Sequence, residues 1–322
     1  MRARPLIPAR DRATRTIRRA GTGLVAAAAL LLLAACGGAG DQDAAAADGG
    51  SEQVLTISAI PDQDPEKLQR LYGAVSSYLG EKLGITVTYQ PVIDYTASVT
   101  SFRRGDLDAV FFGGLSGVQA RLQLPGSVLL AQRDIDENFR SVFIAGTGTG
   151  IAPVTDVAGL AELRGKSLTF GSEVSTSGRL MPQFFLGQAG VTAADLAGDP
   201  GFSGSHDATI KLVQAGTFQV GALNSSVWDA RVKDGTADPA TVTEIFRTPP
   251  YHDYHWLGQP DLDGDFGAGF TERLRTALLD LDGSDQRETE ILELFSAGAF
   301  VPTTADNYTD IEAVARQLGL IQ

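Results

Sequence analysis

From residue 54 onward, short β-rich runs alternate with stretches of helical periodicity. Val54–Ile60 predicts a strand, and the segment from Pro65 to Leu83 predicts a helix with one apolar face. That face is formed by Leu68, Leu71, Tyr72, Val75, Leu79 and Leu83. Asp64 suits the N-cap of this helix and Pro65 its first position, because proline lacks an amide hydrogen that the helix would have to bond.

The same alternation continues along the chain. Further strands are predicted at residues 85–90, 108–112, 128–131, 141–145, 167–170, 218–223 and 242–246. Helices are predicted at residues 97–104, 118–124, 157–163, after Ser177, and at 207–214, 227–232, 270–280, 287–295 and 306–318. Strands that alternate with helices indicate βαβ units, and therefore an α/β protein with a largely parallel sheet. Two sheets of similar size fit the spacing better than one.

The N-terminus has the pattern of an export signal. Seven arginines and one acid in the first 20 residues precede a 12-residue apolar run, Leu24–Ala35. That run is too short to span a bilayer as a helix, which takes about 20 residues, so residues 1–35 predict a signal peptide. The sequence Leu33-Ala-Ala-Cys36 resembles a lipobox, which implies cleavage before Cys36 and lipidation of its sulfur. Residues 36–53 are rich in Gly, Ala and Asp and predict a flexible tether.

Charge and cysteine content exclude several classes of function. The chain has 26 Lys and Arg against 39 Asp and Glu, and its pI is near 4.6. Nucleic-acid binding needs a basic face, which this composition does not supply. The single cysteine excludes a disulfide scaffold and any zinc site built on several thiolates.

The segment Phe170–Arg179 leads from a predicted strand into a predicted helix and places Ser175, Thr176, Ser177 and Gly178 at the turn. The first amides of a helix have no partner within the helix and carry partial positive charge. Together with three hydroxyls they predict an anion site. The alternative is an ordinary serine cap, since Ser and Thr are common N-caps. Pro182 further predicts an irregular first turn.

Two other segments carry candidate chemistry. In residues 201–207 Ser205 can cap a helix while His206 lies at its mouth as a donor, although a plain surface histidine is the alternative. Residues 249–256 gather His252, Asp253 and His255 with three aromatic residues. A metal site is disfavoured there because the spacing lacks a helical frame and further ligands. An aromatic wall beside a ligand is the better interpretation.

Taken together, the motifs SxxSTSG, GSHDATIKLVQAG and TPPYHDYHW, with AIPDQDPEKL, VIDYTASVTSFRRGDLDAVFFGG and the lipobox, resemble the substrate-binding lipoproteins of phosphonate, phosphite and phosphate ABC importers, the PhnD-like family. The resemblance covers nearly all of residues 54–256. It implies a type II periplasmic-binding fold, in which two α/β lobes joined by a two-strand hinge close on a ligand. Lobe I would comprise residues 54–140 and 250–322, and lobe II residues 141–249. The crossing strands would lie near Ser141–Ala145 and Ile245–Trp256.

The resemblance also implies the ligand contacts. The oxyanion would be held by the STSG turn, by a histidine matching His206, by a tyrosine matching Tyr95 and by an acid matching Asp253. One departure concerns Ser116: the family commonly has a Gly-Pro turn followed by a tyrosine, whereas this chain has Phe112-Gly-Gly-Leu-Ser-Gly117. The wall of the site near Ser116 is therefore expected to differ in size or shape. Relatives with this turn are often labelled selenate binders.

The carboxylate of Asp253 bears on the choice of ligand. In a poorly hydrated site it repels a dianion unless a proton lies between them, which a monohydrogen phosphorus oxyanion can supply and selenate or sulfate cannot. Phosphonate, phosphite or phosphate are therefore the expected ligands, and selenate is the alternative. A serine hydrolase using Ser177, His206 and Asp253 is a further alternative, disfavoured because the chain has no G-x-S-x-G elbow. A lipid-anchored sensor or adhesion domain would not explain the hydroxyl-rich turns.

The sequence thus predicts a monomeric binding protein without catalytic activity, cofactor or bound metal. Its partners would be a small oxyanion, an ABC permease and the membrane to which its lipid anchor attaches. It would act on the extracytoplasmic face of the cell membrane.

Overall fold

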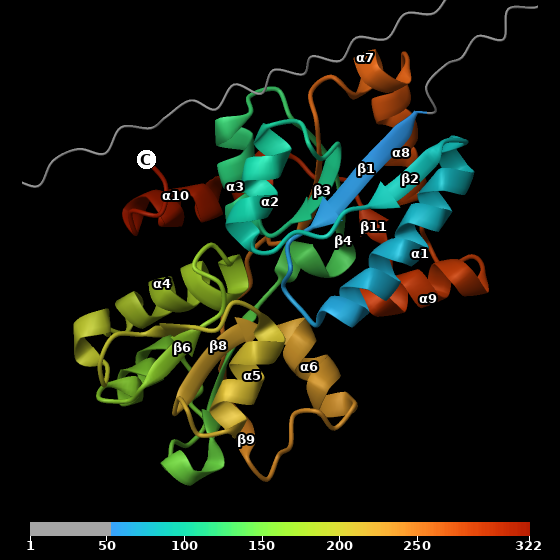
Figure 1. Ribbon diagram of the computed structural model, residues 1–322. Helices are drawn as coiled ribbons and strands as arrows, with labels where there is room; N and C mark the ends of the chain where they lie inside the picture. Colours follow the sequence, from blue (N-terminus) through green and yellow to red (C-terminus); the bar gives the residue numbers. More distant parts are fainter. Residues whose placement is uncertain (1–52) are drawn as a thin grey trace, which may run out of the picture. The chain divides into compact units, whose positions relative to one another are not determined.

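The structure is a computed structural model and describes residues 53–322. This part of the chain forms two β-sheets with helices packed around them, one sheet for each of two lobes (Figure 1). The sheet of lobe I has six strands in the order β11-β4-β10-β3-β1-β2, and that of lobe II has five in the order β7-β6-β8-β5-β9. The prediction of an α/β protein with two sheets of similar size is confirmed.

The strands of lobe I are β1 (Val54–Ala59), β2 (Thr86–Tyr89), β3 (Ala109–Phe112), β4 (Val128–Arg133), β10 (His255–Gly258) and β11 (Phe300–Val301). Those of lobe II are β5 (Ser141–Gly146), β6 (Leu168–Phe170), β7 (Gly201–Phe202), β8 (Val220–Asn224) and β9 (Val242–Arg247). The sequence pattern did not predict β7, β10 and β11.

The α-helices of lobe I are α1 (Pro65–Leu83), α2 (Tyr95–Arg103), α3 (Gly114–Gln123), α7 (Leu262–Phe266), α8 (Phe270–Leu279), α9 (Gln286–Phe295) and α10 (Thr309–Gln317). Those of lobe II are α4 (Met181–Gln188), α5 (His206–Gln214) and α6 (Ser225–Lys233). Short 3-10 helices are η1 (Asp134–Asn138), η2 (Thr147–Thr149), η3 (Val157–Leu163), η5 (Ala193–Asp195) and η6 (Ala305–Tyr308), while η4 (Thr176–Leu180) is a π-helical turn.

Helix α1 shows how local signals fix an element of lobe I. The Asp64 carboxylate accepts hydrogen bonds from the amides of Glu66 and Lys67, and Pro65 occupies the first helical position. Five of the six apolar residues predicted to share a face are buried. The helix ends at Gly84, whose φ of 70° is readily adopted only by glycine. Its limits are those predicted from the sequence.

The expectation of a largely parallel sheet is wrong. β1 pairs in parallel with β2 and β3, but β10 is antiparallel to β3 and β4, and β5 is antiparallel to β8 and β9. The reason is the topology: β5 and β10 are the strands by which the chain enters each sheet from the other lobe. Both sheets are therefore mixed.

The two crossing segments connect β4 to β5 and β9 to β10, so they span residues 134–140 and 248–254. They pair once with each other, where Phe139 and Tyr251 exchange two backbone hydrogen bonds of 2.8 and 2.9 Å. The second crossing agrees with the prediction near Ile245–Trp256. The first does not, because the apolar run Ser141–Ala145 is a central strand of lobe II and the crossing precedes it.

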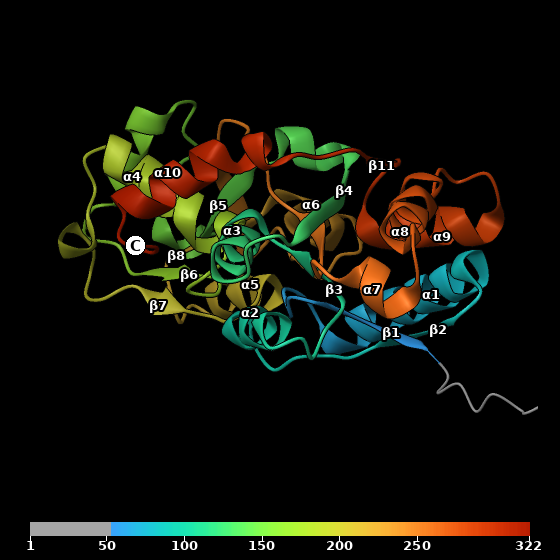
Figure 2. The same ribbon diagram turned by 90° about the horizontal axis from the view of Figure 1, so that it is seen from above.

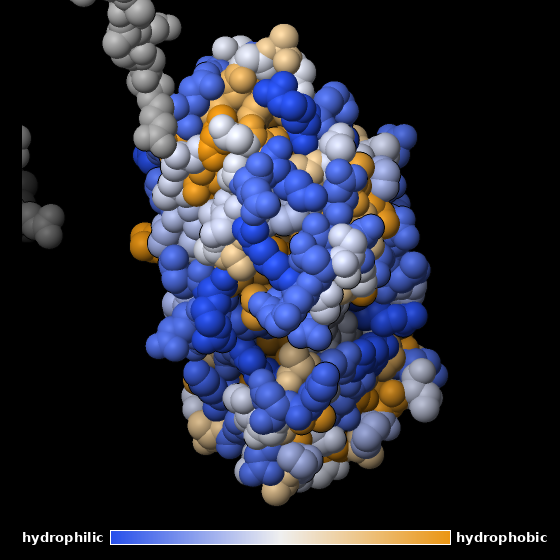
Figure 3. Space-filling model, turned by 90° about the vertical axis from the view of Figure 1, so that its right-hand side faces the viewer, coloured by the Kyte–Doolittle hydropathy of each residue, from blue (hydrophilic) through white to orange (hydrophobic). Residues whose placement is uncertain are grey.

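The face that carries α1 and α9 is mostly hydrophilic (Figure 3). An open groove of about 870 Å³ separates α6 of lobe II from α1 and α9 of lobe I. Its charged lining residues are Lys67, Asp229, Lys233, Glu290 and Glu293. No described helix has both the length and the apolar character needed to cross a bilayer.

Candidate functional site

The serine-rich turn folds as the sequence suggested, at the start of the π-helical turn η4. The Ser175 hydroxyl accepts a 2.9 Å hydrogen bond from the amide of Gly178 and so caps the turn. A Cβ at Gly178 would lie 2.9 Å from that hydroxyl and 3.2 Å from Gly171 Cα, which explains why glycine occupies this position. The irregular turn precedes Pro182, as expected. All four residues from Ser175 to Gly178 are buried.

Thr176 joins this turn to lobe I. Its Oγ1 accepts a hydrogen bond of 2.9 Å from the amide of Leu115, in the first turn of α3. The preceding amide, that of Gly114, donates to Asp253 Oδ1 at 2.8 Å. A Cβ at Gly113 would lie 3.3 Å from both Asp253 Oδ1 and Thr176 Oγ1. The start of α3, the turn of lobe II and the second crossing segment therefore meet at one point.

Ser116 lies in the same first turn of α3, but its hydroxyl donates back to the carbonyl of Gly113 at 3.1 Å. The next residue, Gly117, makes room for a neighbour: a Cβ there would come within 2.3 Å of the imidazole of His255. The GGLSG segment thus supplies backbone amides to the site, and its Gly117 leaves space for the His255 ring in the core of lobe I.

Buried polar atoms without a partner mark where a ligand would fit. Among the described residues, ten buried side-chain nitrogen or oxygen atoms have no hydrogen-bond partner. Three of them belong to predicted site residues: Tyr95 Oη, Ser177 Oγ and Asp253 Oδ2. Each of these residues is at most 1% exposed. Leaving such groups unpaired costs about 1–3 kcal/mol each, so three together suggest a site that a polar ligand completes.

The electrostatics of the site keep its hydroxyls protonated and its carboxyl near the point of ionisation. Burial, followed by the negative charge of Asp62, raises the pKa of Tyr95 well above its usual value of 10, and the nearby Ser175 hydroxyl offsets part of this rise. Burial raises the pKa of Asp253 to about 7, partly offset by the hydrogen bond from Gly114. Near neutral pH the carboxyl can therefore either accept or donate a hydrogen bond.

His206 lies at the mouth of α5 as predicted, and its ring is held by neighbouring groups. Nδ1 accepts from the amide of Asn224 at 3.4 Å, which leaves the ring proton on Nε2, 3.3 Å from Tyr254 Oη. Burial lowers the pKa of His206 to about 4, so the ring is neutral at physiological pH. His206 therefore acts as a donor toward Tyr254.

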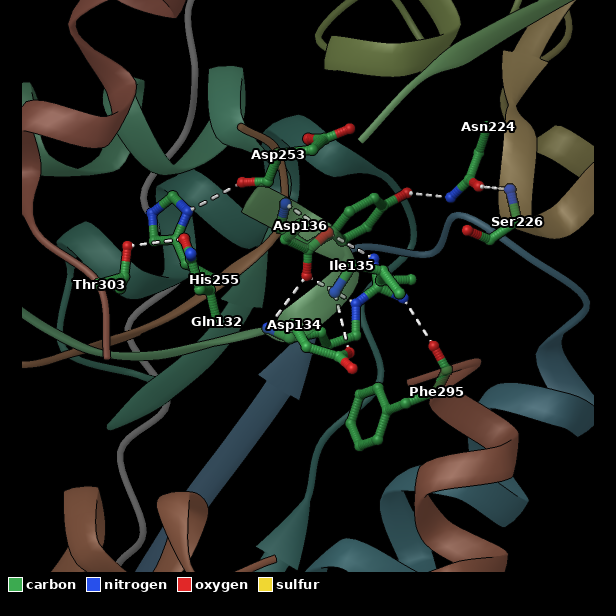
Figure 4. Close-up of polar contacts among 12 residues, drawn as sticks. Gln132, Asp134, Ile135, Asp136, Asn224, Ser226, Asp253, His255, Phe295 and Thr303 are labelled. Atoms are coloured by element: carbon green, nitrogen blue, oxygen red, sulfur yellow. Dashed lines mark hydrogen bonds and ion pairs between the residues drawn. The ribbon is translucent and has the colours of Figure 1, made fainter. Parts of the chain in front are cut away.

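Tyr254 is the centre of a network that links both lobes. Its hydroxyl accepts from Asn224 Nδ2 at 3.1 Å, a contact drawn in Figure 4, and donates to Asp62 Oδ2 at 2.9 Å. The backbone amide of His206 donates to the carbonyl of Asp62 at 2.9 Å. Burial raises the pKa of Asp62 to about 6. This network connects the loop after β1 to the starts of α5 and α6.

A buried ion pair fixes the crossing segments beneath the site. Two nitrogens of Arg133 contact the two carboxylate oxygens of Asp136, each at 2.7 Å. Asp136 also accepts from the amide of Tyr254, and its carbonyl accepts from the amide of Asp253. Figure 4 shows Asp136 below the segment that carries Asp253. The pair thus positions Asp253 and Tyr254.

Of the other residues of 249–256, His255 and Trp256 are buried in lobe I, whereas Pro249 and Pro250 are exposed. Trp256 packs on Tyr72 and Phe111 in the core of lobe I. The His255 ring lies 4.1 Å from that of Tyr308. No group of three or more His, Cys, Asp or Glu side chains within residues 53–322 is arranged to hold a metal ion.

Ser177, His206 and Asp253 do not form a hydrogen-bonded triad. Ser177 Oγ has no partner, the two nitrogens of His206 contact Asn224 and Tyr254, and Asp253 Oδ1 is held by Gly114. A serine nucleophile needs a base within hydrogen-bond reach.

The sequence did not indicate Asp62, Arg133, Asp136 or Asn224 as parts of the site, and it indicated Tyr254 only as one of the aromatic residues of a wall beside the ligand. Asp62 and Tyr254 lie within quoted motifs. The charged segment after β4 could have suggested the Arg133–Asp136 pair from its spacing of three residues. Asn224 carries no signal beyond its position before a helix, where it caps α6.

We compared the chain with known protein families and with solved structures. The family described as the periplasmic substrate-binding protein of phosphonate ABC transporters matches residues 57–308. This chain belongs to that family. It is 46% identical over 271 residues to the probable ABC transporter phosphite binding protein PhnD1 of Prochlorococcus marinus (strain MIT 9301), covering 84% of this chain and 91% of that protein. The phosphate-import protein PhnD of Mycolicibacterium smegmatis is 25% identical over 210 residues, covering 62% and 64% of the two chains.

Solved structures agree. The structure of P. marinus PhnD1 in complex with methylphosphonate superposes with a TM-score of 0.82 and covers 84% of this chain and 99% of its own. A binding-protein component of a phosphonate ABC transporter from Pseudomonas aeruginosa, 16% identical, gives a TM-score of 0.71 over 82% of this chain and 86% of its own, and shows the shared fold. The type II periplasmic-binding fold is therefore confirmed.

Membership of the family establishes the general role. The chain is an extracytoplasmic substrate-binding component of an ABC importer, so it works with a small ligand and a permease. Its family transports a ligand rather than transforming it. The predicted signal peptide, Cys36 and the tether up to residue 52 lie outside the described residues.

Proposed function

We propose that this protein captures a tetrahedral phosphorus oxyanion, that is a phosphonate, phosphite or phosphate, between its two lobes and presents it to the permease. The observation that carries the proposal is the set of three buried, unpartnered polar atoms on Tyr95, Ser177 and Asp253. They come from lobe I, lobe II and the crossing segment, so one ligand would engage all three only in the closed form. Relatives named for phosphite and phosphate, and one solved with methylphosphonate, support this ligand class.

In the proposed complex Tyr95 and Ser177 donate hydrogen bonds to the oxyanion, together with the first amides of η4. Ser175, Thr176 and Gly178 shape the turn that carries Ser177. His206 orients Tyr254 and the adjacent Asp253, and Ser116 supports the start of α3. Asp253 Oδ2 faces the ligand and shares one proton with it.

That shared proton determines selectivity. When Asp253 is ionised, the ligand must bring the proton, which favours monohydrogen phosphorus oxyanions over selenate and sulfate. When Asp253 is protonated it donates instead, and this discrimination weakens. The GGLSG segment associated with selenate binders keeps selenate as the second candidate ligand. Since Ser177 lacks a neighbouring base, we propose that the protein has no hydrolase activity.

The remaining features are proposed from the sequence. Cleavage after residue 35 would leave Cys36 lipidated, so that a tether of residues 36–53 holds a monomeric binding protein at the extracytoplasmic face of the membrane. Lobe I would comprise residues 54–140 and 250–322, and lobe II residues 141–249. No cofactor is required.

Calorimetric titration of the mature protein with phosphite, phosphate, methylphosphonate, sulfate and selenate at pH 8 tests the proposed ligand class. We expect at least one phosphorus oxyanion to bind more than tenfold tighter than sulfate and selenate. Selenate as the tightest ligand, with no phosphorus oxyanion bound, would overturn the choice. Activated esters and phosphoesters should not be turned over by the same preparation.

A further inference from the structure

Lobe II contains a cavity that lies outside the site described above. It has a volume of about 180 Å³ and lies between β6, α4 and the segment that follows α4. Most of its lining is apolar, formed by Phe170, Leu186, Val191, Leu196, Pro200 and Leu318. Leu318 follows α10, which packs against α3 and η4 and lies beside α3 in Figure 2.

One cation lies at the wall of this cavity. The guanidinium of Arg179 is 5.5 Å from the ring centroid of Phe170 and 5.0 Å from that of Phe202. Its Nε donates to Gln183 Oε1 at 2.6 Å, and both residues line the cavity. Arg179 is half-buried; burial lowers its pKa, the negative charge of Glu173 partly offsets this effect, and the guanidinium stays charged.

The partners of Arg179 differ from those of other arginines in lobe II. Arg231 pairs with Asp207 and Asp234, and Arg247 pairs with Asp229 and Glu244. In the described part of the chain, the hydrogen-bond partner of Arg179 is the neutral amide of Gln183. Within residues 53–322 no hydrogen bond holds its two terminal nitrogens, although the charge of the nearby Glu173 acts on the guanidinium.

We propose that this cavity binds a small apolar carboxylate, whose charged end pairs with Arg179 and whose body fills the apolar space. An apolar cavity of about 150 Å³ accepts benzene, so the volume suits a single ring or a short branched chain. Two aromatic faces restrict water around the guanidinium, which strengthens its pairing with a carboxylate. An oxyanion without an apolar body would leave the cavity unfilled.

The position of the cavity links it to lobe closure. Arg179 follows Gly178 in η4, next to the turn that carries Ser177. Leu318 belongs to the C-terminal segment, which is tied to lobe I by a 3.3 Å hydrogen bond from Gln119 Nε2 to the carbonyl of Leu320. A ligand in the cavity contacts both, so it favours the closed arrangement and raises the affinity for the oxyanion by linkage.

Benzoate is the probe that tests this second site, with neutral benzamide as its matched control. In calorimetric titrations of the protein saturated with phosphite, we expect benzoate to bind with a Kd on the order of 1 mM or below and benzamide at least tenfold more weakly. Saturating with phosphite keeps the oxyanion site occupied. Equal binding of the two probes, or no binding of benzoate, would overturn the proposal.

Two variants separate the cavity from the rest of the molecule. Gly187→Leu should block benzoate binding, because Gly187 lines the cavity, and a Cβ there meets no atom within 4 Å, so the first atom of the new side chain does not clash. Arg179→Met should weaken benzoate at least tenfold. Arg164→Met is the control, since Arg164 donates to the main-chain carbonyls of Ala189 and Gly190 and is not among the residues that line the cavity. Benzoate binding that survives both cavity variants would contradict the assignment. Repeating the benzoate and benzamide titrations without phosphite makes the result independent of which oxyanion the main site prefers.

Discussion

At the scale of single residues, Asp253 is distinguished by the unequal surroundings of its two oxygens. Oδ1 accepts from the amide of Gly114, whereas Oδ2 is buried without a partner. The carboxylate is thus held in a fixed orientation, with one oxygen free for a proton shared with a ligand. The substitution Asp253→Asn removes the charge of the side chain and keeps its shape, and it therefore tests the role of the Asp253 carboxylate.

Burial raises the pKa of Asp253 from 3.8 to about 7. Between these values the unfolded chain binds fewer protons than the folded protein, so ionisation of Asp253 lowers the stability of the unliganded protein as pH rises from about 4 to about 7. We expect the Tm of the wild type to fall relative to that of Asp253→Asn across this window. Asp62, whose pKa is raised in the same direction, is present in both proteins and cancels. Calorimetry of the two proteins at each pH measures this difference in Tm. Tm values that change with pH in parallel would contradict the raised pKa of Asp253.

Thr176 has a different role from Ser177, although the two are neighbours. Its hydroxyl accepts from the amide of Leu115 across the lobes. Thr176→Val keeps the volume but leaves that amide unpaired in the closed form, which costs about 1–3 kcal/mol. We expect phosphite affinity to fall about fivefold or more, whereas Thr176→Ser, which restores the hydroxyl, should bind nearly as tightly as the wild type. An unchanged Kd for Thr176→Val in calorimetry would show that this contact does not support closure.

At the scale of elements, α3 depends on two glycines with distinct purposes. Gly113 allows the start of the helix to approach Asp253 and Thr176, and Gly117 accommodates the imidazole of His255. A Cβ at Gly117 would lie 2.3 Å from two ring atoms of that buried histidine. The packing of α3 against β10 therefore has no space for a side chain here.

We expect Gly117→Ala to destabilise the protein by about 1–3 kcal/mol, because the ring must move within a close-packed core. The control is Gly73→Ala in α1, where a Cβ meets nothing within 4 Å and the gain in helix propensity should stabilise by about 0.5–1 kcal/mol. Urea denaturation of the two variants checks the difference. If the two substitutions change the free energy of unfolding equally, the His255 ring does not exclude a side chain at position 117 of α3.

The elements that could be predicted from the sequence are those whose signals are local. The cap, first proline and apolar face of α1 lie within 20 residues of one another, and the turn at Ser175–Gly178 follows the strand that positions it. β10 was missed because its partners, β3 and β4, lie more than 100 residues earlier in the chain, and its His255 and Trp256 resemble a polar aromatic loop. The parallel sheet was wrongly predicted because strand direction depends on the crossings.

The candidate site was partly predictable for the same reason. Motif resemblance indicated Tyr95, Ser177 and Asp253, each of which has a buried polar atom without a hydrogen-bond partner. The roles of Asn224 and Asp62 could not be predicted, because they depend on the meeting of the two lobes. Asp62 of lobe I and Asn224 of lobe II both contact Tyr254. The orientation of His206 toward Tyr254 likewise depends on tertiary contacts that no spacing encodes.

At the scale of the whole molecule, the contacts between lobes describe a closed form. Besides the bond from Leu115 to Thr176, the amide of Asp64 donates to Asp207 Oδ2 at 2.8 Å, and that of His206 donates to the carbonyl of Asp62. A few such bonds and the hinge set the energy difference between open and closed forms. A ligand that binds only the closed form shifts this equilibrium.

We expect small-angle X-ray scattering of the mature protein to show a smaller radius of gyration when phosphite is added. Ser177→Ala should require a higher phosphite concentration for the same change, because the ligand gains less from closure. Sulfate at the same concentration and pH 8 is the control. A radius that does not respond to any bound phosphorus oxyanion would show that capture occurs without closure.

The central claim is that neutral hydroxyls from both lobes hold the oxyanion, and calorimetric titration of phosphite into the wild type, Tyr95→Phe and Ser177→Ala tests it most directly. Each variant removes one donor to a charged ligand, a hydrogen bond worth about 1.5–3 kcal/mol. The account predicts that each variant binds phosphite about ten- to a hundredfold more weakly than the wild type, with the unliganded Tm little changed. Wild-type affinity in both variants would contradict it.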